Sequence, residues 1–240
     1  MSNARRGTIP LAIGIFALNL QAIAWAVLVL IFLEGLTTIL FGAAPRLPLN
    51  FIFTALVLHA ALRTITSNGQ VTGFDATLTS DGSLPWGFLL RTLILTVPGA
   101  LASLMVAGLI LPGGGMEPAL LGGMIGGVST NSLVYALFGT MLLDIAQGRD
   151  GDPEQALDEG RARFPAGVWL ILTGPGLAEF CLFAFEMAAR LLGLATRVAE
   201  AGAEHLNPDG IVVDALLYAG GAFISITMAA ALVRLRQMTV

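Results

Sequence analysis

The chain has 240 residues, of which 56% are hydrophobic and only 12% are charged, and its mean hydropathy is +0.83. Soluble domains carry about 25% charged residues, so the composition excludes an ordinary soluble protein and indicates an integral membrane protein. The net charge is -4, and the sequence contains arginine but no lysine. Because there is no basic patch to neutralise phosphates, the composition argues against binding to nucleic acid. The single cysteine, Cys181, lies in an apolar run, which excludes a disulfide framework and a cysteine metal cluster.

The apolar runs predict an all-α fold, a polytopic helical membrane bundle that forms one transmembrane domain over residues 1–240. A bilayer core of about 30 Å needs about 20 apolar residues per spanning helix. Because the runs are continuous rather than alternating, a membrane β-barrel is not expected. Six spans are expected, at residues 9–33, 49–66, 86–111, 119–146, 165–192 and 211–233.

The first span could instead be a secretory signal peptide, because two arginines precede it and Ala22, Ala24 and Ala26 have the spacing that a signal peptidase accepts. The apolar run continues to Leu33, however, which is longer than the apolar region of a signal peptide. We therefore expect an uncleaved first span. The second span is the shortest and carries His59 and Arg63, so a five-span alternative would omit it.

The arginines predict the orientation, because cytoplasmic loops retain positive charge. With six spans and a cytoplasmic N-terminus, only Arg46, Arg190 and Arg197 fall on the outer side. The expected location is therefore a bacterial inner membrane, with both termini in the cytoplasm. The remaining arginines lie at or near the cytoplasmic side: Arg5, Arg6, Arg63, Arg91, Arg149, Arg161, Arg163, Arg234 and Arg236.

A charged segment separates the fourth and fifth spans and contains a helix start signal. Asp152 is a suitable N-cap, Pro153 suits the first helical position, and Gln155 follows three residues after the cap. The pattern predicts a short amphipathic helix that rests on the membrane surface.

The acidic residues Asp150, Asp152 and Glu154 also raise the question of a cation site, since hard cations prefer several carboxylates on one turn. The segment lacks the spacing of a calcium-binding EF-hand loop and its final bidentate glutamate. The favoured interpretation is that these three carboxylates are exposed to solvent, and no metal is expected.

A weak internal duplication is a further hypothesis. The segment around Gly148 aligns with the one around Gly69, and "LPWG" near residue 85 aligns with "FPAG" near residue 165. Each half would then consist of a span, a short acidic helix and a span started by proline, which is a parallel repeat. Chance alignment of apolar sequence is the alternative.

The element "LFGTMLLDIAQGRDGDPEQALDEGRARF" consists of a span end, a Gly-Arg turn, a small amphipathic helix and a returning span. Over residues 51–192 this pattern resembles uncharacterised bacterial six-helix integral membrane families, including the membrane domain attached to some glycerophosphodiester phosphodiesterases. The resemblance implies a fold rather than an activity, and no catalytic residue carries over from it.

The "GGMIGG" sequence predicts a close helix contact. Gly122 pairs with Gly126 and Gly123 with Gly127 at small-xxx-small spacing. Packing within the chain is favoured over packing against another protein.

Polar residues at membrane depth are the candidate functional residues. Glu179 lies in the middle of the fifth span; Glu186 and Arg190 follow on the same helical face and can pair with each other at helix spacing. Because Glu179 has no such local partner, it needs a proton, a polar cavity or a bond to another span. The candidate partners are Asn131, His59 and the start of the following helix at "TGPG". A structural hydrogen bond is favoured over a role in transport.

No catalytic residues and no cofactor are expected, because no nucleophile, base and orienting group can be assembled from the sequence. The first functional hypothesis is a non-catalytic accessory protein that stabilises or helps to assemble a membrane complex. The expected partners are the lipid bilayer and other membrane protein subunits. The alternative is a transporter of small solutes or lipids that uses a polar site around Glu179.

Overall fold

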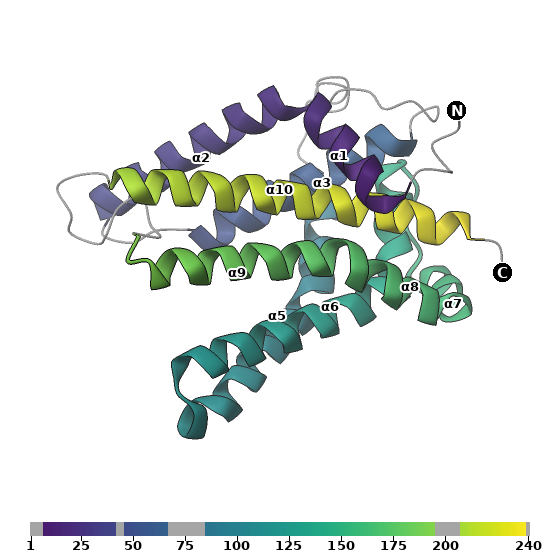
Figure 1. Cartoon of the computed structure of the whole chain (residues 1–240). Coiled ribbons are helices and arrows are strands. Elements are labelled where there is room, and N and C mark those ends of the chain that lie inside the picture. The colour runs from purple at the N-terminus through teal and green to yellow at the C-terminus, as the bar shows by residue number, and fades with distance from the viewer. Residues whose placement is uncertain (1–6, 42–45, 67–84, 195–206, 239–240) are drawn as a thin grey trace.

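The structure is a computed structural model and describes residues 7–41, 46–66, 85–194 and 207–238 (Figure 1). All regular structure in these ranges is helical, which confirms the predicted all-α bundle. The helices are α1 (Thr8–Leu18), α2 (Leu20–Phe41), α3 (Arg46–Thr66), α5 (Trp86–Gly114), α6 (Met116–Ala146), α7 (Pro153–Ala162), α8 (Phe164–Ile171), the π-helix η2 (Leu172–Gly176), α9 (Leu177–Leu191) and α10 (Pro208–Gln237).

Six helices among the described residues are long and apolar enough to cross a membrane, which confirms the number of spans and a multi-pass membrane protein. One of the six consists of α8, η2 and α9 joined end to end. The segments are Leu20–Leu40, Pro48–Thr66, Trp86–Gly114, Met116–Ala146, Phe164–Leu191 and Pro208–Gln237.

The predicted first span, 9–33, is wrong in its bounds, because the helix is interrupted at Asn19. The Asn19 side chain donates a hydrogen bond of 2.8 Å to the Ile15 carbonyl, and the Asn19 backbone leaves the helical conformation with φ -108° and ψ 12°. Asparagine side chains compete in this way for backbone groups. The apolar run therefore forms a short helix, α1, and a separate span, α2, that begins at Leu20 and extends to Phe41.

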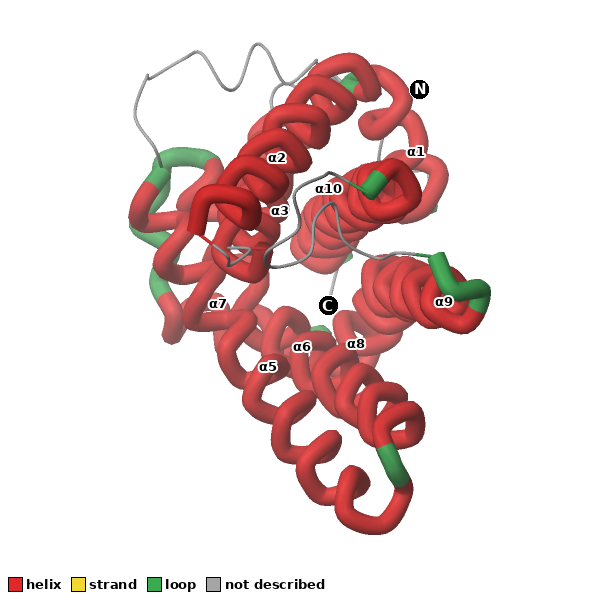
Figure 2. Tube along the Cα trace, turned by 90° about the vertical axis from the view of Figure 1, so that its left-hand side faces the viewer, coloured by secondary structure: helices red, strands yellow, loops and turns green. Residues whose placement is uncertain are grey.

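The last span, α10, is the centre of the bundle. It lies against α1, α2, α3 and α9 (Figures 1 and 2), and 56% of its most apolar window is buried, compared with 11% for α5. Small residues such as Ala222, Ala229 and Ala230 are fully buried along it, which allows the neighbouring helices to approach closely. At its C-terminal end, Arg234 donates a hydrogen bond of 3.1 Å to the Thr8 hydroxyl, so the two ends of the described chain lie together.

Helices α5 and α6 form a long antiparallel hairpin whose tip stands away from α2 and α10 (Figures 1 and 2). The buried residues of α6 are concentrated in its C-terminal half, from Ser132 to Ala146, where it joins the bundle. Towards the tip the two helices contact mainly each other.

Helix α7 begins as the sequence predicts. Asp152 is its N-cap, with the side chain accepting a 2.9 Å hydrogen bond from the Glu154 backbone N–H, and Pro153 is its first residue. The helix packs on α6 at Gly160, where an added Cβ would lie 2.6 Å from the Leu137 Cα. Residues 67–84, which hold the other half of the proposed repeat, lie outside the described residues.

An ionic cluster joins the ends of α6, α7 and α10. Asp144 Oδ1 lies 2.5 Å from an Arg236 nitrogen and 3.1 Å from Arg149 Nε, and Arg236 also lies 4.0 Å from Glu159. Asp144 is only 8% exposed, and its buried charge is balanced by Arg236 and by Arg149, whose side chain remains exposed to solvent. The cluster fixes α7 to the end of the bundle.

Candidate functional site

The fifth span changes its helical type close to Glu179. Pro175 has no backbone N–H to donate, and the chain widens into the π-helix η2 before α9 resumes at Leu177. Gly174, Pro175 and Gly176 are buried, with Gly176 facing Val128 of α6. Single π-turns inside α-helices are frequent at functional sites.

Glu179 lies in the first turn of α9, half-buried, and is directed towards α6. It is close enough to Tyr135 for the two side chains to interact electrostatically. Among the described residues its carboxyl makes no hydrogen bond or ion pair. The single structural hydrogen bond expected from the sequence is therefore not seen in the described part of the chain.

The two candidate partners of Glu179 face other helices. Asn131 of α6 packs against Gly99 of α5, in the space that a Cβ would fill, and its buried Oδ1 accepts no hydrogen bond from the described residues. His59 of α3 packs edge-on against Phe88 of α5, with ring centroids 4.8 Å apart. Within the described part of the chain, neither residue makes a hydrogen bond to Glu179.

The other two charged candidates form a local pair. Arg190 donates a hydrogen bond of 2.7 Å to Glu186 Oε1, one helical turn earlier on α9. Each charge is neutralised by its neighbour, so this pair is less suited to hold a ligand than Glu179 is.

The four candidate glycines lie at the contact between α6 and α5. An added Cβ would lie 2.9 Å from Ser103 O at Gly123, and 2.9 Å from a Val106 methyl at Gly126. Gly122 faces Ile110 and Gly127 faces Ser103 in the same way. Their absent side chains allow the two helices of the hairpin to pack closely.

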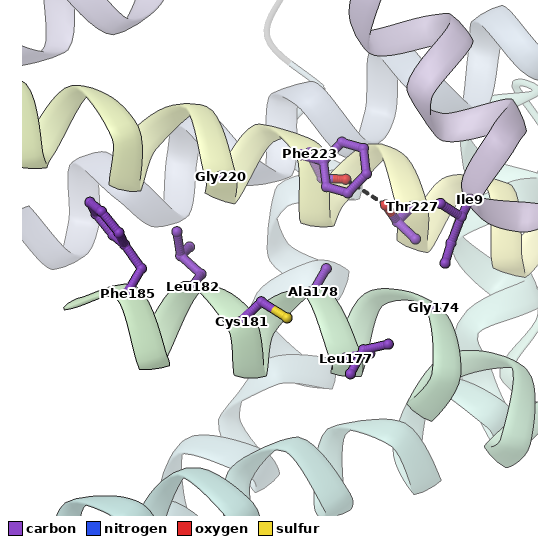
Figure 3. A pocket seen from close by; sticks show the side chains of 10 residues that line it. All are labelled: Ile9, Gly174, Leu177, Ala178, Cys181, Leu182, Phe185, Gly220, Phe223 and Thr227. Carbon is purple, nitrogen blue, oxygen red and sulfur yellow. Dashed lines mark hydrogen bonds between the residues drawn. The ribbon is translucent and has the colours of Figure 1, made fainter. Parts of the chain in front are cut away.

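An apolar groove lies on the opposite face of α9, between α9, α10 and the start of α1 (Figure 3). Its volume is about 380 Å³. In Figure 3, Ala178 is directed from α9 towards Phe223 of α10 and Leu182 towards Gly220, and Cys181 lies between them. Glu179 is not among the residues that line it.

Two buried acidic residues were missed by the sequence analysis. Glu34 of α2 is 1% exposed, and its Oε2 accepts a 2.6 Å hydrogen bond from the hydroxyl of Tyr218 on α10. Asp214, which is fully buried, lies one turn before Tyr218 on the same helix. The sequence could have identified both residues, because a carboxylate inside an apolar run is unusual in a membrane span.

Among the described residues, no group of three or more His, Cys, Asp and Glu side chains is placed to hold a metal ion. The acidic residues Asp150, Asp152 and Glu154 are all exposed. Their side chains therefore meet solvent at the beginning of α7.

No family model matches this chain, and no curated protein or solved structure does so either. The resemblance to the six-helix membrane families remains a prediction.

Proposed function

We propose that this chain is a non-catalytic accessory protein of a bacterial inner membrane, which stabilises or helps to assemble a membrane complex. The part that meets the partner is the hairpin of α5 and α6. The partner is a transmembrane helix of another protein subunit.

The observation that supports this proposal is the exposure of the hairpin. Leu104, Met105 and Leu109 of α5 are 71%, 69% and 80% exposed, and the hairpin tip is remote from the central helix α10. The glycines of α6 are already used within the hairpin, so the outward surface consists of large flexible side chains. Helices in a membrane associate through such van der Waals packing, and Leu and Met adapt well to a partner surface.

Gentle purification of the full chain through a C-terminal tag tests this role. A membrane protein should co-purify in stoichiometric amount, and the double variant Leu104→Ala, Leu109→Ala should recover several-fold less of it. Phe32→Ala is the matched control, because Phe32 of α2 is 67% exposed on a different helix. Recovery of the chain without any stoichiometric membrane protein would contradict the proposal.

We also infer that both termini are cytoplasmic. Nine of the twelve arginines then lie at or near the cytoplasm, and the hydrogen bond between Arg234 and Thr8 agrees with termini on one side. Reporter fusions after Gly151 and Met238 should give a cytoplasmic signal, while a fusion after Gly114 should give the opposite one. A cytoplasmic signal at Gly114 would refute this orientation.

The alternative function is a transporter of small solutes or lipids around Glu179. What favours it is a half-buried carboxyl without a hydrogen-bond partner among the described residues, placed three residues after the end of a π-helix in a membrane span. The groove on the far side of α9 is apolar, however, and Glu179 does not face it. The accessory role is therefore the better supported of the two.

A further inference from the structure

We propose that the buried carboxyl of Glu34 is a binding site for a monovalent metal cation, located between α2 and α10. The observation that carries the proposal is a buried carboxylate oxygen that no group in the described part of the chain satisfies. The site is independent of the accessory role, since it lies on α2 and α10 rather than on the hairpin of α5 and α6.

Glu34 lies inside the membrane span α2 and is only 1% exposed. Its Oε2 accepts a 2.6 Å hydrogen bond from the Tyr218 hydroxyl, a length typical of a hydroxyl that donates to an ionised carboxylate. The other oxygen, Oε1, has no hydrogen-bond partner among the described residues. An ionised carboxylate in such a place is costly unless a positive charge accompanies it.

The hydroxyl groups beside Glu34 do not satisfy Oε1, because their protons are already donated elsewhere. Thr38, one turn later on α2, donates to the Glu34 backbone carbonyl at 2.7 Å, and Thr37 donates to backbone carbonyls of its own helix. Tyr218 donates its one proton to Oε2. Among the side chains that the structure describes, no arginine forms an ion pair with Glu34. The missing positive charge must therefore come from outside these groups.

A second buried carboxyl, that of Asp214, adds negative charge to this region. Asp214 is fully buried and lies one turn before Tyr218 on the same side of α10. Helical side chains lean towards the N-terminus, so the Tyr218 ring extends over the turn that holds Asp214 and brings the Glu34 carboxyl to that level. Two acidic side chains on facing helices therefore lie at one depth of the membrane, which favours a cation there.

The small number of carboxylates selects a monovalent rather than a divalent cation. Divalent ions usually take several carboxylates, and no group of three or more His, Cys, Asp and Glu side chains is placed to hold a metal ion within the described ranges. Sodium sites within membrane helices also use neutral backbone oxygens. The hydroxyl oxygens of Tyr218 and Thr38 are neutral oxygens close to Glu34. The ligand that we assign is Oε1 of Glu34.

The test measures thermal unfolding of the purified full chain in detergent, with sodium chloride or potassium chloride replacing choline chloride at constant ionic strength. An ion that binds only the folded chain raises the Tm by about 3–5 °C for each tenfold increase in its concentration above the dissociation constant. We expect this rise with at least one of the two ions. An unchanged Tm with both ions would overturn the proposal. A Tm that responds to acidification but to neither ion would show that Oε1 takes a proton, and would overturn it as well.

A variant that removes the charge provides the second measurement. Glu34→Gln keeps an acceptor for Tyr218, so in choline chloride it should unfold close to the unaltered chain, but neither metal ion should raise its Tm. Asp158→Asn is the matched control, because it removes the same charge from a side chain that is 82% exposed, and it should keep the full response. A folded Glu34→Gln protein that still responds refutes the site. If Glu34→Gln does not fold, Asp214→Asn takes its place and should weaken the apparent affinity several-fold; an unchanged affinity then refutes the site.

Discussion

The hydroxyl of Tyr218 donates a 2.6 Å hydrogen bond to Glu34 Oε2, which joins the central helix α10 to α2 across 184 positions of the sequence. Glu34 is 1% exposed and Tyr218 is 2% exposed, and Tyr218 also packs edge-on against Phe53 of α3. This contact therefore connects three spans at a place where water is excluded.

Replacing Tyr218 by Phe removes the donor of this hydrogen bond. The other oxygen of Glu34, Oε1, is buried without a hydrogen-bond partner among the described residues, so the variant leaves the carboxyl poorly satisfied. We expect Tyr218→Phe to lower the free energy of unfolding in detergent by about 1–3 kcal/mol. Glu34→Gln, which keeps an acceptor for Tyr218, should cost less. Equal stability of Tyr218→Phe and the unaltered chain would show that the hydrogen bond contributes nothing.

A methyl group at position 160 should separate α7 from α6. The Cβ of Gly160→Ala would lie 2.6 Å from the Leu137 Cα and 2.7 Å from its carbonyl carbon, and backbone atoms cannot move aside as a flexible side chain does. We expect a loss of about 1–3 kcal/mol, as for overpacking elsewhere, with faster hydrogen exchange in α7. Gly108→Ala is the control, because its Cβ meets nothing within 4 Å and alanine favours a helix. A Gly160→Ala protein as stable as the control would disprove the close contact.

The start of α7 depends on Asp152. Asp152→Ala removes the acceptor for the Glu154 N–H and should destabilise the helix by about 0.5–2 kcal/mol, seen as faster amide exchange at its first turn.

Asp150→Asn is the control for Asp152→Ala. It should have little effect, since Arg91 binds the backbone carbonyl of Asp150 rather than its side chain. Calcium-dependent stabilisation that Asp150→Asn abolishes would contradict the solvated-charge interpretation of this segment.

Glu179 separates the two functional hypotheses. In an accessory protein, Glu179→Gln keeps shape and polarity next to Tyr135 and should leave both the fold and the growth phenotype unchanged. A proton-coupled transporter needs the carboxyl to exchange its proton, so the same variant would stop flux while remaining folded. Flux in proteoliposomes, measured together with thermal stability, distinguishes the two. A stable variant that has lost flux would refute the accessory role.

The spans could be predicted because each depends only on about 20 consecutive apolar residues, a property that is local in the sequence. The pair of Glu186 and Arg190 was predictable for the same reason, since helix geometry brings residues four positions apart together. The break at Asn19 was missed, because one asparagine hardly changes the hydropathy of a long window.

The contact between Glu34 and Tyr218 could not be predicted, because it depends on how α2 and α10 pack and no sequence spacing encodes it. The hydrogen bond expected between Glu179 and Asn131 or His59 is not seen among the described residues, for a related reason. Membrane depth alone does not show which way a side chain faces, and Asn131 and His59 both face α5.

The central claim, that the α5–α6 hairpin meets another membrane protein, is tested most directly by photocrosslinking in living cells. A benzophenone amino acid at position 104 should give one discrete adduct with a second protein, resolved as a shifted band and identified by mass spectrometry. The same probe at Phe32, which is about equally exposed on α2, should give no such protein adduct. If position 104 also gives no protein adduct, the hairpin is covered by lipid and the accessory role that we propose is contradicted.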